Sequence, residues 1–250
     1  MKSRVTTRPR EATADQLTYH LHGDPHHRAS ALSDIILGGQ DGLVNVLGVI
    51  LGVAAATADA HIVLVAGLAA TFAESVSMGA VAYTSTMAAA DVYASEQARE
   101  YRHVRRVPEL ERQEIRELYA CKGFAGDLLD RIVETITANP DVWVAVMLAE
   151  EHHLTPISRA HALRAAFVVG VSAVVGSLIP LIPFVMLPVG TSMGVSIVVA
   201  ALVLFAVGAY KARLTVGRPG RSGLELAIIG TLSALVGYAV GALLRVPVTP

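Results

Sequence analysis

Long apolar stretches, separated by short polar breaks, run through most of the chain. Five segments contain no Asp, Glu, Lys or Arg: residues 42–58, 60–73, 75–90, 165–210 and 226–244. A helix that crosses about 30 Å of hydrocarbon needs about 20 residues. The fourth segment is long enough for two such helices, and Pro180, Pro183 and Pro188 near its middle favour a turn between them. The pattern therefore predicts five transmembrane helices, at about residues 33–57, 61–90, 163–183, 188–210 and 224–244.

Residues 91–160 differ from these segments because they are rich in charged and helix-forming residues. The helical pattern of the second span continues to about Arg106, and Pro108 is an acceptable first residue for the next helix. Two further helices are expected at about 127–138 and 141–153. The expected fold class is an all-α integral membrane protein with five transmembrane helices and a cytoplasmic helical insertion between the second and the third. The expected domains are a tail (1–32), the first two spans (33–90), the insertion (91–160) and the last three spans (161–250).

Lysine and arginine lie almost entirely on one side of this predicted topology. Nineteen of the twenty fall in the N-terminal tail, the 91–164 segment and the 211–223 loop, which five spans place together. Regions rich in these residues stay in the cytoplasm, so the N-terminus is predicted to be cytoplasmic and the C-terminus outside. With 16% charged residues and a formal net charge of −1, no nucleic-acid partner is expected. The expected partner is the lipid bilayer, and the excess of arginine over lysine hints at a prokaryotic plasma membrane.

The N-terminal tail is polar and lacks the charged-then-apolar order of a cleavable signal peptide. It is expected to be disordered. Its histidines are interpreted as solvated, with metal capture as the alternative; they are His20, His22, His26 and His27. Cys121 is the only cysteine, which excludes an internal disulfide, and it is expected to be buried.

Two carboxylates, Asp41 and Glu74, each lie in an otherwise uncharged stretch long enough to cross a bilayer. An ionised carboxylate is costly in hydrocarbon, so a membrane helix that carries one usually handles ions or protons. Asn45 follows Asp41 by one helical turn and Met78 follows Glu74 by one turn. A thioether beside a carboxylate suits a divalent transition metal. We predict a transport pathway along these four residues, with a helix-end position for Asp41 and core packing for Met78 as the alternatives.

The insertion carries acidic residues at helical spacing. Glu111 and Glu114 are neighbours on one predicted helix, and Met147 lies with Glu150 and Glu151 on another. Charged helix surfaces are usually only solvated, but the recurrence on two helices and the added thioether favour metal binding. Carboxylates alone suit Mg, Ca or Mn, whereas an imidazole or thioether shifts the preference towards iron and zinc. The insertion is therefore interpreted as a metal-binding module.

Five motifs, in this order, resemble the vacuolar iron transporter family from about Ser33 onward. The first span contains SDIILGGQDGL from Ser33, and the second contains AGLAATFAESVSMGA from Ala66. They are followed by a Pro-Glu-x-Glu-Arg-x-Glu run from Pro108, a Trp-x-x-x-Met-Leu-x-Glu-Glu motif from Trp143 and the turn LIPLIP from Leu178. The resemblance implies a homodimer of five-helix subunits, with a metal path at the dimer interface lined by the first two spans. It also implies a cytoplasmic three-helix domain with glutamate and methionine ligands, and exchange of ferrous iron against protons.

Matched by position, the transmembrane aspartate of the family is Asp41 and its pathway methionine is Met78. The cytoplasmic ligands implied by the resemblance fall at Glu100, His103, Glu111, Glu114, Met147 and Glu151, with Glu150 adjacent. His103 departs from the family pattern because it stands where the family has a glutamate, and an imidazole titrates near neutral pH. Ala70 also departs, because it occupies the position of a second-span glutamate found in some members. Glu74, one turn from Met78, is then the candidate replacement.

The predicted function is a transporter, not an enzyme, that moves Fe²⁺ or Mn²⁺ out of the cytosol in exchange for protons. The metal is both the transported and the regulatory ligand, and no permanent cofactor is expected. One alternative is a manganese-selective carrier of the same fold, because octahedral oxygen-rich sites also suit Mn²⁺. Another is a membrane-anchored ferritin-like di-iron oxidase, because Glu100-x-x-His103 and Glu150-x-x-His153 have the spacing of di-iron ligand pairs. A ferritin-like site needs a bundle of long helices. Pro108 and Asn139-Pro140 make such a bundle unfavourable, since they divide the insertion into short helices.

Overall fold

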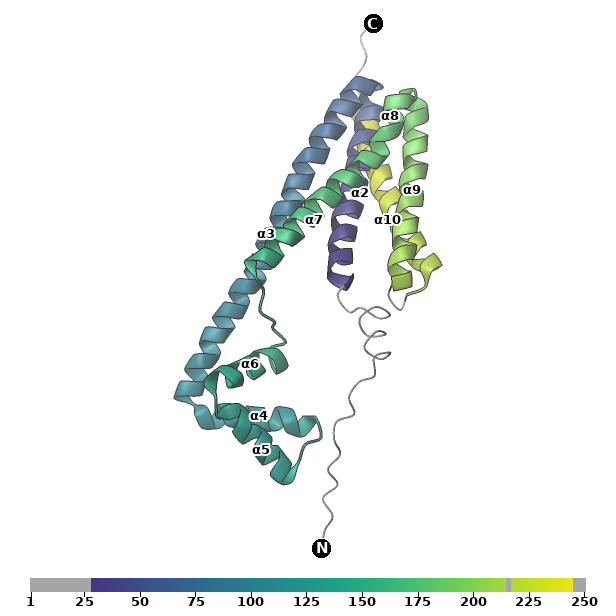
Figure 1. Cartoon of the computed structure of the whole chain (residues 1–250). Coiled ribbons are helices and arrows are strands. Elements are labelled where there is room, and N and C mark those ends of the chain that lie inside the picture. The colour runs from purple at the N-terminus through teal and green to yellow at the C-terminus, as the bar shows by residue number, and fades with distance from the viewer. Residues whose placement is uncertain (1–27, 215–216, 245–250) are drawn as a thin grey trace, which may run out of the picture.

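The computed structural model describes residues 28–214 and 217–244, and every regular element within them is a helix. In chain order the helices are α2 (Arg28–Thr57), α3 (Ala60–Arg106), α4 (Pro108–Cys121), α5 (Gly126–Thr137), α6 (Pro140–Glu150), α7 (Arg159–Leu178), η2 (Ile179–Leu181), α8 (Ile182–Met186), α9 (Val189–Leu214) and α10 (Pro219–Leu243). Figure 1 shows a bundle of long helices and a smaller group formed by α4, α5 and α6, with α3 running between them. The predicted all-α fold is confirmed.

Five helical segments in the described chain are long and apolar enough to cross a membrane: most of α2, then α3, α7 to α8, α9 and α10. This confirms the predicted number of spans. The third segment continues through η2 and α8 to Met186, past Pro180 and Pro183, so it ends three residues later than predicted and the turn before α9 contains only Leu187 and Pro188. A break in a helix leaves carbonyl groups that need donors. Serines of α9 provide them, since Ser192 Oγ donates to Pro183 O (3.0 Å) and Ser196 Oγ donates to Pro180 O (2.8 Å).

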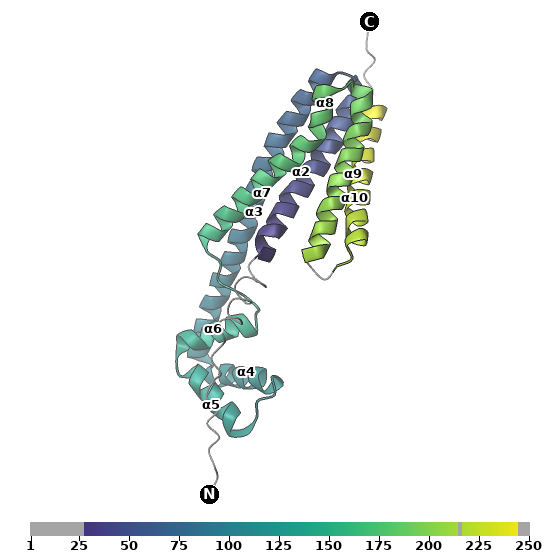
Figure 2. The same cartoon turned by 45° about the vertical axis from the view of Figure 1, so that its right-hand side comes forward.

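α2 packs against α3, α7, α9 and α10, and glycines allow the closest of these approaches. A Cβ atom at Gly176 of α7 would lie 2.1 Å from Gly39 O, and a Cβ atom at Gly241 of α10 would lie 1.9 Å from Gly52 O. Small residues permit such close contact between membrane helices. The glycines of α2 therefore serve packing within this chain, against α7 near the start of α2 and against α10 near its end. Figure 2 shows α9 and α10 side by side beyond α2.

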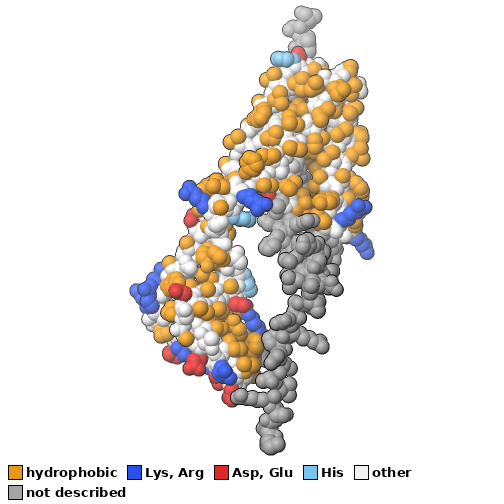
Figure 3. All heavy atoms as spheres, viewed as in Figure 1, with side chains coloured by type: hydrophobic (Ala, Val, Ile, Leu, Met, Phe, Trp, Pro, Cys, Tyr) orange, Lys and Arg blue, Asp and Glu red, His pale blue; other side chains and the backbone are white. Residues whose placement is uncertain are grey.

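The core of the bundle lies around α2, whose Leu47, Ile50 and Leu51 are fully buried. The outside of the bundle is also apolar. Figure 3 shows hydrophobic side chains over its visible face, whereas acidic and basic side chains gather over the group formed by α4, α5 and α6. An apolar exterior suits lipid, in which exposed polar groups are costly.

The helices α4, α5 and α6 pack at the far end of α3 and have a core of their own. It contains Ile115 of α4, Val133 of α5, and Trp143 and Met147 of α6. Gly123 and Gly126 shape the turn from α4 to α5 with positive φ values of 93° and 58°, which glycine adopts without strain. α5 and α6 are bent by 111° at their junction. The helices predicted along the insertion are confirmed to within a few residues.

Two expectations have other outcomes. Cys121, which was expected to be buried, is exposed. It lies six residues after the buried Ile115, and this spacing turns it away from the packed side of α4. The expected disordered tail and its histidines fall on residues 1–27, which lie outside the described residues. Residues 28–32, which were also assigned to the tail, form the first part of α2.

Candidate functional site

Asp41, Asn45 and Glu74 meet where α2 and α3 pack together, and we call these three residues the intramembrane set. Asn45 Nδ2 donates a hydrogen bond to Glu74 Oε1, and Asp41 interacts with the same carboxylate. Asp41 and Glu74 are half-buried, while Asn45 is exposed. Met78, also half-buried, follows one turn farther along α3. Three of the four residues predicted for the pathway are thus in contact, near the surface of the bundle.

A second polar site lies where α3 meets α4 and the turn that follows α6. A cavity of about 310 Å³ is lined there by five glutamates, two histidines and one arginine, together with two apolar residues. The glutamates and histidines form what we call the acid–histidine cluster: Glu96, Glu100, His103, Glu111, Glu114, Glu151 and His152. Of the predicted cytoplasmic ligands, five belong to this cluster.

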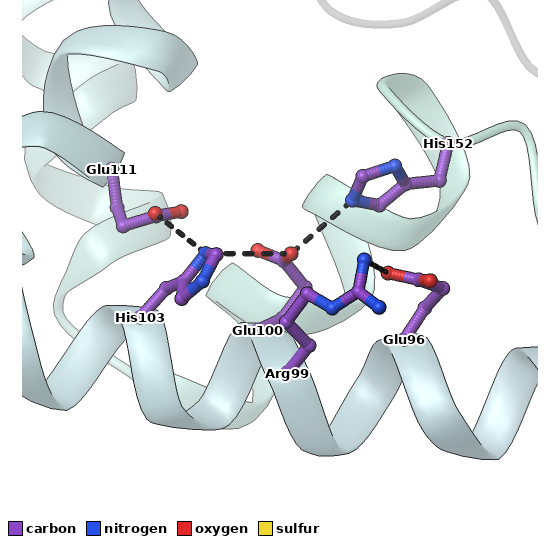
Figure 4. A network of polar contacts seen from close by, with 6 residues as sticks. All are labelled: Glu96, Arg99, Glu100, His103, Glu111 and His152. Carbon is purple, nitrogen blue, oxygen red and sulfur yellow. Dashed lines mark hydrogen bonds and ion pairs between the residues drawn. The ribbon is translucent and has the colours of Figure 1, made fainter.

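The two histidines of the cluster flank Glu100 (Figure 4). His152 Nε2 lies 3.2 Å from Glu100 Oε1. His103 Nδ1 lies 3.9 Å from the same oxygen and 3.2 Å from Glu111 Oε1. Figure 4 shows the two rings on either side of Glu100, one carried by α3 and the other by the turn after α6. The network therefore ties three separate segments of the chain together.

The carboxylates at the centre of the cluster are buried without a full set of partners. Glu100 is 3% exposed and Glu111 is 2% exposed. The Oε2 atom of each has no hydrogen-bond donor among the described residues. A buried carboxylate oxygen without a donor is unfavourable. A divalent cation would satisfy these oxygens together, because carboxylates are strong ligands for such ions.

Burial and like charges raise the pKa values of two glutamates in the cluster. Burial, followed by the charges of Glu114, Glu100 and Glu151, raises the pKa of Glu111 from its ordinary 4.5 to about 7. Partial burial, followed by the charge of Glu114, also raises the pKa of Glu151. Below about pH 7 the metal-free cluster therefore holds a proton on Glu111, in the place where a cation would be bound.

Two of the predicted ligands lie outside the cluster. Met147 is fully buried in the apolar core with Ile115 and Trp143, and its side chain does not line the cavity. Glu150 forms an ion pair with Lys122, the residue that follows α4. Neither residue contacts the cluster through its side chain in the interactions of the described residues.

Two residues of the cluster are absent from the sequence-based prediction. Glu96 precedes Glu100 by one helical turn and pairs with Arg99 at 3.1 Å. The i, i+4 spacing of the two glutamates is the signal that could have identified it. His152 follows the end of α6, where helical spacing gives no information. Only the turn seen in the structure directs it to Glu100.

The VIT family model matches residues 32–242, almost the whole of the five candidate spans and the group between them. The chain belongs to the VIT family. A vacuolar iron transporter 1 from Eucalyptus grandis is 32% identical over 231 residues, which cover 92% of this chain and 93% of that protein. A vacuolar iron transporter 1 from Arabidopsis thaliana is 32% identical over 240 residues, which cover 95% of this chain and 94% of that protein. A vacuolar iron transporter from Plasmodium falciparum (isolate 3D7) is 27% identical over 235 residues, which cover 90% of this chain and 86% of that protein.

Family membership and five apolar helices together make this VIT-family chain a multi-pass membrane protein, not an enzyme. The structure also bears on the ligand pairs behind the oxidase hypothesis. Glu150 and His153, one of the two pairs behind the oxidase hypothesis, do not join Glu100 and His103. Glu150 pairs with Lys122, and His153 is exposed. A di-iron centre needs both pairs around one site.

Proposed function

We propose that this chain is a divalent metal transporter that moves Fe²⁺ across the membrane in exchange for protons. The proposal extends to this chain the substrate in the names of its relatives, the vacuolar iron transporters. The observation that carries it is the course of α3 (Figure 1). This one helix holds Glu74 and Met78 within an apolar span and Glu100 and His103 in the acid–histidine cluster.

The intramembrane set supplies the charge that a cation needs in hydrocarbon. Asp41 and Glu74 interact with each other, and the uncharged amide of Asn45 donates a hydrogen bond to Glu74. A divalent cation between the two carboxylates would offset their repulsion and compensate for the water that the cation loses. When the cation leaves, protons neutralise the carboxylates, so metal and protons move in opposite directions. Met78 adds a soft, neutral ligand one turn away.

A second copy of the chain is needed to enclose this set. Asn45 is exposed, and an apolar groove between α2 and α10 runs from it along Gly48 and Gly52. A polar group that faces lipid is unfavourable. A twofold axis beside α2 would bring the two intramembrane sets together and cover both. The proposed functional unit is therefore a homodimer with the metal path between the first spans of its subunits.

The acid–histidine cluster supplies metal to this path from the cytoplasm. Nineteen of the twenty lysines and arginines fall on the side of the membrane where five spans place α4, α5 and α6, and such regions stay in the cytoplasm. Metal captured there moves out of the cytosol, and the same ion acts as cargo and as regulatory ligand. The N-terminus then lies in the cytoplasm and the C-terminus outside.

Metal uptake by proteoliposomes tests this function. The reconstituted protein is offered Fe²⁺, Mn²⁺, Zn²⁺ or Ca²⁺, with and without a pH gradient. We expect Fe²⁺ uptake that becomes faster when the vesicle interior is acidic, since protons then leave as metal enters. Faster uptake of Mn²⁺ than of Fe²⁺ would favour the manganese carrier. Oxygen consumption on addition of Fe²⁺ would favour the oxidase, and uptake of none of the ions would refute the proposal.

A further inference from the structure

Two groups of three ligand residues meet at Glu100. Glu100, His103 and Glu111 form the first group, and Glu96, Glu100 and His152 form the second. Within each group the ligand atoms lie within 4.8 Å of one another. Metal–ligand bonds of about 2.0–2.2 Å hold the ligands of one ion about 3–4 Å apart, so small side-chain movements would complete either group. The second group contains two residues that the sequence motifs do not include.

The turn after α6 directs His152 into the cluster. The backbone N–H groups of Glu151 and His152 both donate to Met147 O, at 3.0 and 3.3 Å, and close the end of the helix. His152 is left half-buried with its Nε2 atom 3.2 Å from Glu100 Oε1. The next residue, His153, is exposed and has a φ of 54°. Two adjacent histidines therefore have opposite surroundings, and only the first faces the carboxylates.

The state of Glu100 points to a cation rather than to a structural hydrogen bond. The side chain is 3% exposed, and its Oε2 atom has no donor among the described residues. The cavity is lined by five glutamates, and Arg99 is the one lysine or arginine among its described lining residues. Arg99 pairs with Glu96 at 3.1 Å and so offsets only one of these charges. A buried carboxylate in such an excess of negative charge is stabilised by a divalent ion.

We propose that Glu96, Glu100 and His152 bind a divalent ion of borderline softness, such as Fe²⁺, Co²⁺ or Zn²⁺, next to the ion held by Glu100, His103 and Glu111. Oxygen ligands alone suit Mn²⁺, Mg²⁺ and Ca²⁺, whereas an imidazole nitrogen favours iron, cobalt and zinc. His152 is therefore a selectivity ligand that makes the cluster prefer iron to manganese. The inference rests on the proposed function, because it refines the metal-capturing role of the same cluster.

Titration of the full-length protein in detergent with Co²⁺ and with Mn²⁺ tests this assignment. Co²⁺ is the probe for the imidazole ligands because its visible absorption changes with ligand type, and bound Mn²⁺ is followed by electron paramagnetic resonance. His152→Asn is compared with His153→Asn, the same change one residue later. Asparagine tolerates the positive φ at position 153. Glu96→Gln is the second variant, and far-ultraviolet circular dichroism checks that every variant is folded.

We expect His152→Asn to weaken Co²⁺ binding about tenfold or more, the size of loss that even an indirect ligand contact can cause. The Co²⁺ spectrum should change and the preference for Co²⁺ over Mn²⁺ should fall by a similar factor. Glu96→Gln should weaken the binding of both Co²⁺ and Mn²⁺, because it removes an oxygen ligand. His153→Asn should match the unchanged protein in every measurement.

Equal Co²⁺ binding by the His152→Asn and His153→Asn variants would overturn the assignment. An equal loss of Co²⁺ and Mn²⁺ affinity in His152→Asn would also overturn it, since the loss of a merely structural residue lowers the affinity for both ions alike. In either case, the Glu111→Ala/Glu114→Ala variant tests the capture role separately. If it loses Co²⁺ binding, the cluster still captures metal, and only the assignment of His152 fails. If the unchanged protein binds neither ion, both this inference and the capture role fail.

Discussion

The intramembrane set and the acid–histidine cluster place the same kind of side chain in opposite surroundings. Glu74 is half-buried at the surface of the bundle and accepts a hydrogen bond from Asn45. Glu100 and Glu111 are buried, and each keeps one oxygen without a donor among the described residues. The set is open at the side of the bundle. The cluster is formed by α3, α4 and the turn after α6 of one chain.

This difference suits two different tasks. A pathway residue has to release its metal, and the neutral amide of Asn45 leaves Glu74 with a partner when the metal departs. A capture site gains affinity from the reverse arrangement, because unpartnered buried oxygens make the metal-free state unfavourable. We therefore expect passage at the first site and retention at the second. The neighbours of each glutamate decide which task it has.

Loss of Asp41 should separate the two regions most clearly. Asp41→Ala is expected to abolish Fe²⁺ uptake by proteoliposomes, because the charge that compensates for dehydration of the cation is gone. Asp41→Asn, of nearly the same volume, should be just as inactive. The visible spectrum of Co²⁺ bound to the cluster is the control and should be unchanged in the same preparations, since the histidines of the cluster are intact. Normal Fe²⁺ uptake by Asp41→Ala would refute the proposed path.

The cluster should influence transport less than the path does. Glu111→Ala/Glu114→Ala is expected to remove most metal binding but to slow Fe²⁺ uptake only severalfold, because the intramembrane set remains. Calorimetric titration and proteoliposome uptake measure the two effects. Glu109→Ala/Glu117→Ala is the matched control, since it removes two exposed glutamates from the same helix. If both double variants bind metal equally well, the cluster is only a solvated surface.

The cluster should also titrate near neutral pH. Because the pKa of Glu111 is raised to about 7, a proton competes with the metal, and metal affinity should fall as the pH drops through about 7. Glu111→Gln should reduce this pH dependence, because one of the competing protons is removed.

Stability of the metal-free protein should show the opposite trend. The folded state binds the proton on Glu111 more tightly than the unfolded state does. The free energy of unfolding is therefore expected to fall as the pH rises from about 4.5 to about 7. Thermal melts in the presence of a chelator measure this slope. An equal slope in Glu111→Gln would assign it to another group.

Met78 should affect selectivity rather than rate. Met78→Leu is expected to keep the fold, because the two side chains have similar volumes, and to weaken the preference for Fe²⁺ over Ca²⁺. Competition between these ions in proteoliposomes measures the change. Met87→Leu, farther along the same helix, serves as the control. An unchanged preference in Met78→Leu would leave Met78 as a packing residue.

The smallest effect is expected at Glu150. Its ion pair with Lys122 is partly exposed, and such pairs contribute about 0–1 kcal/mol to stability. Glu150→Ala should leave metal binding and uptake unchanged, whereas Glu151→Ala should weaken metal binding. Parallel calorimetric titrations distinguish the two neighbours. A loss of binding in Glu150→Ala would mean that it leaves Lys122 when metal is present.

The structure bears out the predictions that depend on local sequence. The five spans follow from runs without charge, the start of α4 follows from Pro108, and the turn before α5 follows from Gly123 and Gly126. The role of Asp41 and Glu74 in a pathway stays a prediction, although both residues stand out in the sequence because a lone carboxylate in an apolar run is conspicuous. Such features depend on a residue and its near neighbours, so no knowledge of the packing is needed.

Membership of the acid–histidine cluster depended on the packing instead. Spacing along α6 put Met147, Glu150 and Glu151 in one motif, but the three side chains have separate environments: the apolar core, Lys122 and the cavity. His152 joins the cluster because the helix ends just before it and the chain turns back towards α3.

The physical reason lies in the arrangement of the helices. Burial of one face of α6 against α4 and α5, across a bend of 111°, decides which side of that helix can reach Glu100. Residues about 50 positions apart are brought together by this burial, and hydrophobic packing is not directional enough for spacing alone to predict it.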